Sequence, residues 1–329
     1  MPRAGLRFGC FGGFMADKLV QIVAQLRPEL QAALIAAFDD IRDGVDYPAL
    51  ELAIERGDVA GAIDALNLDE GSFAPYVLIA TTIFMRYGAA FAPRLGVRFT
   101  GDISPDIAVA VGRMTQETRE AIQDVVASRL GRRETAKRIR PLIGLSRAQV
   151  SYVESMRERL LSGDPDEMRA VLSGQTLRDK RYDRMIKRAI VEARRSQREV
   201  AAGRPALVPR EAISPTKVDE IAEAYARKLK AKRAADIAQI EADQYAEAAK
   251  YQSALKVAGP VKKTWHHSSI YINARPDHVG MSGRSVALDE SFIMPDGVPM
   301  RYAHDPRGGA RHNASCRCRT SYEIRDGEV

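Results

Sequence analysis

Residues 214–255 read SPTKVDEIAEAYARKLKAKRAADIAQIEADQYAEAAKYQSAL. Ser214 can cap a helix and Pro215 suits its first turn, so the stretch is predicted to be one helix, about 60 Å long at about 1.5 Å per residue. The charges on this helix are segregated, with a basic first half and an acidic second half: Arg227, Lys228, Lys230, Lys232 and Arg233 against Glu241, Asp243 and Glu247. We therefore expect a strut that bridges separate bodies or pairs with neighbouring copies.

The N-terminal region also carries a helical pattern. Between residues 17 and 40 apolar side chains recur at helical spacing on both sides of Pro28: Val20, Val23, Leu30, Leu34 and Phe38. A proline can start a second helix or kink the first. The pattern predicts an amphipathic helical hairpin.

Two further helical segments precede the long helix. Ser104 and Pro105 open one helix, and a separate helix is expected from about residue 117 to residue 130. In a third segment Ser146 and Gln149 have the spacing of a capping box, and Gly163 is placed to end that helix.

The character of the chain changes after Gly259. SSIYINA (268–274) and SFIMPDGVPMRYA (291–303) are rich in β-branched and aromatic residues, and Pro-Asp-Gly at 295–297 predicts a turn between two strands. If residues 316–324 are extended, one face carries Cys316, Cys318, Thr320, Tyr322 and Ile324, and the other carries Arg317, Arg319, Ser321 and Glu323. Both thiols then point the same way.

These patterns predict a mainly α fold with a long strut helix and a small α+β C-terminal domain that contains a β-hairpin. The expected parts are a disordered leader at 1–14, a helical region at 15–100, a second helical region with a basic helix at 104–202, a linker at 203–213, the connecting helix at 214–258 and the C-terminal domain at 259–329. Met15 would serve equally well as the start of the chain.

Composition limits the class of protein. The chain has 329 residues, a formal net charge of +7 and a pI of about 9.3, which favours acidic partners such as nucleic acid. Three cysteines do not make a disulfide framework, so the reducing cytoplasm of the producing cell is the expected compartment. The most apolar run, 74–85, is shorter than the roughly 20 residues of a membrane span, and no membrane partner is expected.

Residues 178–198 hold nine basic and three acidic side chains on one expected helix. One interpretation is a solvated face whose arginine stems cover apolar neighbours. The other is a nonspecific contact with the phosphates of double-stranded DNA, made by Arg181, Arg184, Lys187, Arg188, Arg194 and Arg195.

All five histidines lie from residue 266 onward, in the same stretch as the two closely spaced cysteines. Thiolate and imidazole groups are the ligands of tetrahedral zinc, so His278, Cys316 and Cys318 could bind this metal together with His304 or His266. Equally, buried cysteines can act as small apolar residues and a buried histidine can serve only to satisfy a hydrogen bond.

A set of residues with specific order and spacing in this stretch resembles the domain of the phage Mu F-like minor head, or head morphogenesis, family. The set comprises Trp265, Arg275 in Asn-Ala-Arg, His278, Gly283, Asp305 before a proline, Asn313, and Cys316 and Cys318 in Cys-Arg-Cys. IAQIEADQYAEAAKYQ (237–252) resembles the helix that precedes this domain in the family.

The resemblance implies a minor capsid protein of a tailed phage or prophage. Such a protein is made in the host cytoplasm and is placed inside the head near the portal. Its expected partners are the portal and the major capsid protein, and its expected role is in procapsid assembly, with packaging or ejection served by nonspecific DNA contact. We expect Trp265 to be a large buried body, Arg275 and Asp305 to form an ion pair, and His278 to organise polar groups.

An enzyme is the rival hypothesis. RGGARHNASC (307–316) has the composition of metal-dependent or histidine-dependent nucleases, so a nuclease or toxin-like enzyme carried in the virion is the alternative. A cysteine nucleophile, Cys316 or Cys318 activated by His278 or His312, is a further form of it. Because a Gly-rich loop separates His304 from His312, the spacing fixes no active-site geometry, and no catalytic residue is assigned.

Overall fold

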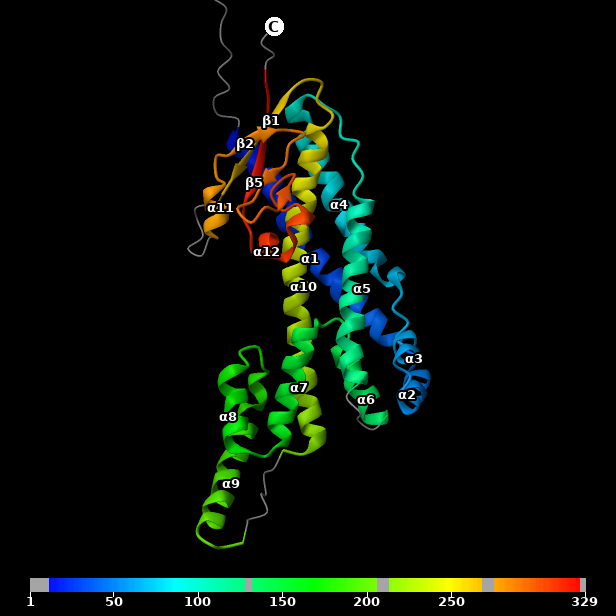
Figure 1. Cartoon of the computed structure of the whole chain (residues 1–329), viewed down its shortest axis with the longest axis vertical. Coiled ribbons are helices and arrows are strands. Elements are labelled where there is room, and N and C mark those ends of the chain that lie inside the picture. Colours follow the sequence, from blue (N-terminus) through cyan, green and yellow to red (C-terminus); the bar gives the residue numbers. More distant parts are fainter. Residues whose placement is uncertain (1–11, 128–131, 206–212, 268–274, 326–329) are drawn as a thin grey trace, which may run out of the picture. The chain divides into compact units, whose positions relative to one another are not determined.

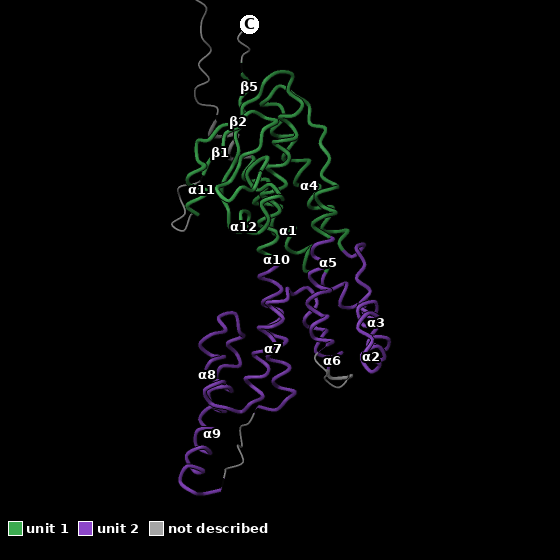
Figure 2. Tube along the Cα trace, viewed as in Figure 1, with its two compact units in different colours: residues 1–37, 73–111, 234–329 green, residues 38–72, 112–233 purple. Residues whose placement is uncertain are grey.

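The computed structural model describes residues 12–127, 132–205, 213–267 and 275–325. The chain is mostly helical, with a few short antiparallel strands near its C-terminus, which confirms the predicted fold class (Figure 1). It divides into two compact units, each assembled from distant segments (Figure 2). Unit 1 combines residues 1–37, 73–111 and 234–329, and unit 2 combines residues 38–72 and 112–233.

The helical elements run in the following order: α1 Gly12–Asp43, α2 Tyr47–Arg56, α3 Val59–Asp64, η1 Glu70–Phe73, α4 Ala74–Phe91, η2 Ala92–Leu95, α5 Ser104–Val126, α6 Arg132–Ile139, η3 Arg140–Leu142, α7 Arg147–Leu161, α8 Pro165–Gly174, η4 Lys180–Tyr182, α9 Asp183–Ala201, α10 Pro215–Ala254, α11 Pro276–Gly280, η5 Pro306–Gly308 and α12 Gly309–Asn313. The strands are β1 Val261–His266, β2 Ser285–Ala287, β3 Phe292–Ile293, β4 Pro299–Met300 and β5 Arg319–Ile324.

The predicted helical hairpin at 17–40 is wrong, because α1 is one helix that contains Pro28. The apolar stripe continues through the proline, with Leu26 and Leu30 both buried, so ending the helix there would expose one half of the stripe. Pro28 itself is exposed. The helix begins at Gly12, inside the expected leader of residues 1–14, of which 1–11 lie outside the described residues.

The segment 104–130 also differs from its prediction. α5 is one continuous helix from Ser104 to Val126, not two, because its buried face passes without interruption from Ile107 through Met114 to Ile122. The capping box before α7 is confirmed, since the Ser146 side chain accepts a hydrogen bond from the Gln149 backbone and the Gln149 side chain accepts one from the Ser146 backbone.

The long helix is confirmed as α10, Pro215–Ala254. Its residues up to 233 belong to unit 2 and those from 234 to unit 1. Residues 241–250 are buried on every side, so the acidic half of α10 packs inside this chain. A helix that is buried all round needs internal partners for its charged side chains.

The strands form two small antiparallel sheets in unit 1. β1 is the central strand of a three-stranded sheet in the order β2-β1-β5, and it pairs with β5 along its whole length, from Val261 opposite Ile324 to His266 opposite Arg319. β3 and β4 form the predicted hairpin, with Phe292 opposite Met300. Figure 1 shows the three-stranded sheet beside the C-terminal half of α10. Strand β1 is absent from the sequence-based assignment.

Two predicted segments fall outside the described residues. SSIYINA (268–274) lies outside the described residues, as do residues 206–212 of the expected linker. Within the described residues, none of the helices combines the length and the apolar character that crossing a membrane requires.

Candidate metal centre

The stretch that ends in β5 alternates between two environments. Cys316 and Cys318 are 4 % and 0 % exposed, whereas the intervening Arg317 and the following Arg319 are only partly buried. This is the alternation expected of an extended chain, in which successive side chains point to opposite faces. The two thiols therefore enter the same core while the two arginines face another element.

That element is α10. The buried carboxylate of Asp243 accepts hydrogen bonds from Arg319 at 2.9 Å and from Arg317 at 3.2 Å. One turn further along, Glu247 accepts a hydrogen bond from the Thr320 backbone N–H at 3.0 Å, and Lys250 donates one to the Thr320 carbonyl at 2.7 Å. The acidic residues of α10 thus hold the Cys-Arg-Cys-Arg stretch in a fixed register.

A compact apolar cluster surrounds the two thiols: Trp265, Met281, Phe292, Met294, Met300 and Ala303. Trp265 is fully buried, and its ring meets Phe292 edge-on at a centroid distance of 5.4 Å and His278 at 5.8 Å. The cluster draws on β1, β3, β4 and the loops between them. The small C-terminal core is therefore closed around sulfur and imidazole groups.

His278 lies on the short helix α11 and is 2 % exposed. Its Nδ1 atom is 3.4 Å from the Cys316 sulfur and 3.5 Å from the Cys318 sulfur. Ligand atoms of all three residues lie within 4.8 Å of one another. In a tetrahedral zinc site, Zn–S bonds of about 2.3 Å and Zn–N bonds of about 2.0–2.1 Å place sulfur and nitrogen about 3.6 Å apart. The three groups have the spacing of zinc ligands.

A chain of hydrogen bonds fixes the orientation of the His278 ring. Its Nε2 atom is 3.2 Å from Nδ1 of His312, and Nε2 of His312 is 3.0 Å from the carboxylate of Asp296. A carboxylate only accepts, so His312 donates from Nε2; with both rings neutral, its Nδ1 accepts from Nε2 of His278. The lone pair on Nδ1 of His278 then faces the two sulfurs, as in sites where a carboxylate orients a metal-binding histidine.

Two further histidines lie near these three groups, although neither belongs to the set whose ligand atoms are all within 4.8 Å of one another. Nδ1 of His267 is 3.7 Å from the Cys318 sulfur, which also matches the tetrahedral spacing. His304 is fully buried, and neither of its ring nitrogens has a hydrogen-bond partner within the described residues. His304 lowers the pKa of Cys316. Its backbone has a positive φ of 67°, a conformation that costs about 1–3 kcal/mol. Such a buried imidazole beside Cys316 fits a ligand position.

The two thiols share one proton. The pKa of Cys316 is lowered, chiefly because Cys318 donates a hydrogen bond to it, although burial acts in the opposite direction. The pKa of Cys318 is raised because it holds the shared proton, because it is buried and because the Cys316 thiolate is adjacent. A divalent cation would replace this proton and allow both thiolates to persist in the core.

The other predicted motif residues have structural contacts. Gly283 has a φ of +83°, which favours glycine, and its N–H donates to the Trp265 carbonyl at 2.8 Å. Asn313 is buried and donates from its side chain to the Asp305 carbonyl at 2.8 Å.

Two expectations about this region are wrong. Asp305 pairs with Arg301, at 2.8 and 3.1 Å, and not with Arg275, which donates to the Ala314 carbonyl. Arg301 is four residues from Asp305, so local chain geometry brings the two together directly. His266 is exposed and hydrogen-bonds Ser321 at 2.7 Å across the sheet, so it faces away from the thiols.

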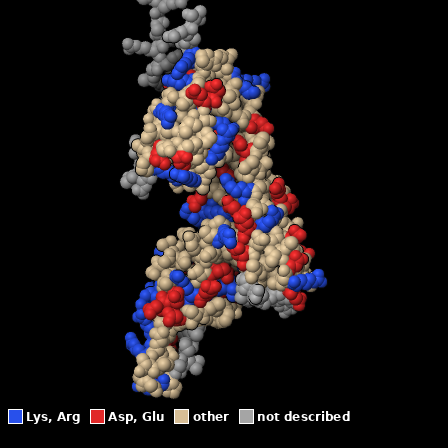
Figure 3. Space-filling view, viewed as in Figure 1, with Lys and Arg blue, Asp and Glu red and all other residues tan. Residues whose placement is uncertain are grey.

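The residues predicted to contact DNA lie on and just before α9, whose opposite face buries Ile186, Ala189 and Ile190. Arg184, Lys187 and Arg188 share one exposed surface. Arg181 pairs with Asp179 at 2.6 Å and Arg194 with Asp166 at 3.1 Å, while Arg195 is exposed. On the face of the molecule in Figure 3, basic and acidic side chains are interspersed over the surface.

The geometry bears on the enzyme hypothesis. Asp296, His312, His278 and Cys316 form a chain of the kind that can activate a nucleophile. A nucleophile must reach its substrate, however, and both sulfurs are buried. The arrangement favours binding of an ion over attack on a nucleic acid.

Comparisons with known proteins identify no relative. No family model matches the chain, and neither a curated protein nor a solved structure matches it at a significant level. The resemblance to head morphogenesis proteins therefore depends on the residues named above.

Sequence reasoning did not assign His267 or Asp296 to the site. Residues 266 and 267 are adjacent histidines, and only the strand register of β1 shows which of them approaches Cys318. Asp296 belongs to the turn of the β3-β4 hairpin, where an aspartate is common for conformational reasons alone. No signal in the sequence separates its role in the turn from its bond to His312.

Proposed function

We propose that this chain is a minor head protein of a tailed phage or prophage, placed inside the head near the portal, whose C-terminal core is held by a structural zinc ion. The portal and the major capsid protein are its proposed partners during procapsid assembly in the host cytoplasm. The support is the set of residues that resembles the Mu F-like domain together with the way these residues gather in one core.

The convergence of His278 with Cys316 and Cys318 is the observation that supports the proposal most. These residues are 38 and 40 positions apart in sequence, yet the nitrogen lies 3.4 and 3.5 Å from the two sulfurs. Trp265, Gly283 and Asn313, which belong to the same sequence set, are also used in this core or in the turns that close it. A domain this small gains stability from a metal when its apolar core is limited.

The zinc ion would act as a cross-link and not as a catalyst. His278, Cys316 and Cys318 would supply three ligands, and His267 or His304 the fourth. A fully ligated tetrahedral site leaves no position for substrate, which is typical of structural zinc. His278, Cys316 and Cys318 would thereby connect α11 with the stretch that leads into β5.

The test is whether the protein is a component of assembled heads. The chain is expressed from its phage or prophage with all other head genes intact, heads are purified, and the amount of this chain relative to the major capsid protein is measured by quantitative mass spectrometry. We expect a low but constant ratio. A Cys316→Ser, Cys318→Ser double variant should be lost from particles, while the control Cys10→Ser should be retained.

Two results would contradict the proposal. Heads that contain no copy of the wild-type chain would exclude the structural role in the virion. Turnover of DNA or RNA by the pure protein, lost on replacing His278 or His312, would favour the nuclease or toxin-like enzyme instead.

The surface of α9 supports a second part of the proposal, nonspecific contact with double-stranded DNA. Arg184, Lys187 and Arg188 could face phosphates together, and such binding weakens as salt concentration rises. Replacing Arg181, Arg184, Lys187 and Arg188 with glutamine should reduce DNA retention at low salt. Unchanged retention would leave α9 as a solvated helix face.

A further inference from the structure

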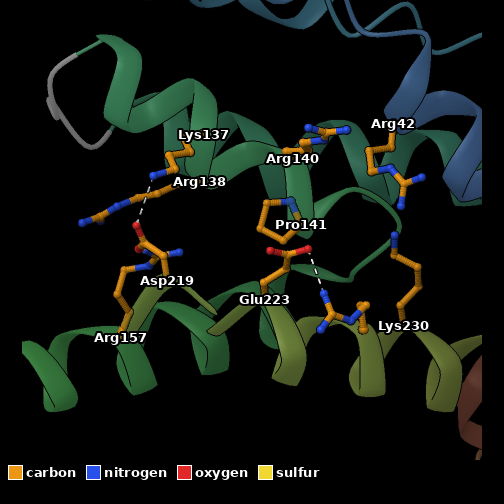
Figure 4. Close-up of a pocket in the computed structure, with 10 residues that line it drawn as sticks. Arg42, Lys137, Arg138, Arg140, Pro141, Arg157, Asp219, Glu223 and Lys230 are labelled. Atoms are coloured by element: carbon orange, nitrogen blue, oxygen red, sulfur yellow. Dashed lines mark hydrogen bonds and ion pairs between the residues drawn. The ribbon is translucent and has the colours of Figure 1, made fainter. Parts of the chain in front are cut away.

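Unit 2 contains a cavity of about 470 Å³ that the proposed function does not use. Figure 4 shows Lys137, Arg138 and Arg140 on one side, from α6 and η3, facing Arg157 of α7 and Lys230 of α10 on the other. Its volume is within the range of sites for small ligands, about 300–1,000 Å³.

The lining of this cavity is strongly basic. Seven of its ten residues are arginine or lysine, against two carboxylates, Asp219 and Glu223 of α10. These two are already engaged: Asp219 pairs with Arg157 and, at 3.7 Å, with Lys137, and Glu223 pairs with Arg227 at 2.8 Å. The lining has more positive than negative charge.

Two of these basic side chains are buried. Arg157 is 2 % exposed and Lys230 is 6 % exposed, and burial lowers the pKa of Lys230 even though Asp39 lies 3.3 Å away. Arg157 is compensated by Asp219 and Glu154, whereas Lys230 has Asp39 as its carboxylate partner, and burying a cation with incomplete compensation is costly. An anion bound in the cavity would lower this cost.

The excess of positive charge is clearest at one end. The pKa of Asp43 is lowered chiefly by its hydrogen bond to Arg42, and the charges of Arg42, Arg140 and Lys230 lower it further. Asp39 and Asp43 are the carboxylates here: Arg42 pairs with both at 2.9 Å, and Lys230 pairs with Asp39. Arg140 stacks over the Tyr47 ring at 5.9 Å, and no described residue forms an ion pair with it. Three cations therefore share two carboxylates.

We propose that this cavity binds phosphate groups. Five of the seven basic residues are arginines, whose planar guanidinium presents two parallel N–H donors to a pair of phosphate oxygens. The ten lining residues include no aromatic side chain on which a base could stack, so recognition is of phosphate and not of a nucleobase. The phosphates can come from a free polyphosphate or from a DNA backbone.

This inference does not rest on the proposed role in phage heads. The cavity is built from α1, α6, η3, α7 and α10, and none of the α9 residues assigned to DNA contact lines it. The C-terminal metal ligands belong to unit 1, so loss of zinc and loss of phosphate binding are separate outcomes.

The experiment measures binding of inorganic tripolyphosphate to the full-length chain by isothermal titration calorimetry, at fixed ionic strength. The variant is Lys137→Gln, Arg140→Gln, because both side chains are exposed and their loss should not unfold the protein. We expect the Kd to rise at least roughly tenfold, as for the loss of hydrogen bonds to a charged group. The matched control is Arg56→Gln, Arg119→Gln, which removes the same charge from exposed positions elsewhere in unit 2.

Four outcomes decide the proposal. Loss of binding in the cavity variant alone supports it. Equal losses in the cavity and control variants would show diffuse electrostatics and overturn it, as would equal binding by wild type and the cavity variant. Equally tight binding of polyglutamate would overturn the assignment to phosphate. If the variant does not fold, the thermal shift of wild-type protein decides, because tripolyphosphate must raise the unfolding temperature more than sulfate at equal ionic strength.

A second arm identifies the source of the phosphates. The same proteins are titrated with a short DNA duplex in place of tripolyphosphate. A cavity variant that loses affinity for both ligands assigns the site to DNA phosphates, and one that loses only tripolyphosphate assigns it to a free polyphosphate.

Discussion

At the scale of single residues, the most unusual feature is a lysine buried in the C-terminal sheet. Lys263 of β1 is fully buried, donates to the Leu288 carbonyl at 2.9 Å and lies over the rings of Tyr251 and Phe292, at 5.2 and 5.5 Å. Burial lowers its pKa to about 8, and four charged neighbours modify that value: Asp289, Asp305, Arg301 and Glu290. A lysine that exchanges its proton so close to neutrality links the stability of the C-terminal sheet to pH.

The expected pH dependence follows from this shift. With a pKa of about 8 in the folded state and 10.5 when unfolded, Lys263 loses its proton first in the folded protein. The unfolded state then binds more protons between these values, so stability should rise as pH increases from 8 to 10.5. Melting temperatures of wild type and Lys263→Met are compared across this range, with the partly exposed Lys262→Met as control. The melting temperature of the wild type should rise with pH relative to that of Lys263→Met. Parallel curves would contradict the lowered pKa of Lys263.

At the scale of elements, α10 is the helix on which unit 1 is organised. Residues 241–250 are buried all round, and their acidic side chains have hydrogen-bond or ion-pair partners. The Glu241 carboxylate accepts a hydrogen bond from Tyr76 of α4, and Tyr76 and Tyr245 are 2.5 Å apart through their hydroxyls. Asp243 forms an ion pair with Arg27 of α1 at 3.4 Å and with the two arginines beside the cysteines. The register between helix and strand is thus set by ion pairs.

Asp243→Asn should destabilise unit 1 by about 3 kcal/mol, since removing one partner of a buried ion pair leaves the others uncompensated. The measurement is the free energy of unfolding from urea denaturation, followed by circular dichroism. Glu220→Gln, which removes an exposed carboxylate that pairs with Lys217 on the same helix, should cost much less. Equal effects of the two substitutions would show that the Asp243 pairs contribute no more than a surface ion pair.

At the scale of the whole molecule, the two compact units separate two kinds of chemistry. Unit 1 holds the cluster of His278, Cys316 and Cys318, and unit 2 holds the basic cavity. Zinc binding should therefore affect one unit far more than the other. Because ligands from distant positions would meet at a bound ion, its removal should loosen every segment that they connect.

Metal removal provides the corresponding prediction. Protein purified without chelator should contain about one zinc ion per chain by elemental analysis, and treatment with a chelator should remove it. Hydrogen exchange should then speed up at backbone amides of residues 261–267 and 275–324, with little change in α7 and α8. The Cys316→Ser, Cys318→Ser variant should resemble the chelated wild type. Uniform exchange across both units, or protein without metal that exchanges like the native form, would contradict a structural ion.

The sequence by itself determined the elements whose signals are local. The extent of α10, the capping box at Ser146, the β3-β4 turn and the alternation around Cys316 all follow from neighbouring residues, because helix caps, turns and strand faces depend on spacing along the chain. The presence of His278, Cys316 and Cys318 in one candidate site could also be foreseen from their ligand chemistry.

Only the tertiary structure decided the rest. Pro28 lies inside a continuous helix because packing on both sides outweighs the local preference, and Asp305 pairs with Arg301 instead of Arg275. The choice of His267 over His266 beside Cys318, the burial of Asp243 and the gathering of basic residues around the unit 2 cavity likewise depend on contacts between distant segments. Spacing along the chain carries no information on such contacts, since burial and charge pairing are set when separate elements pack together.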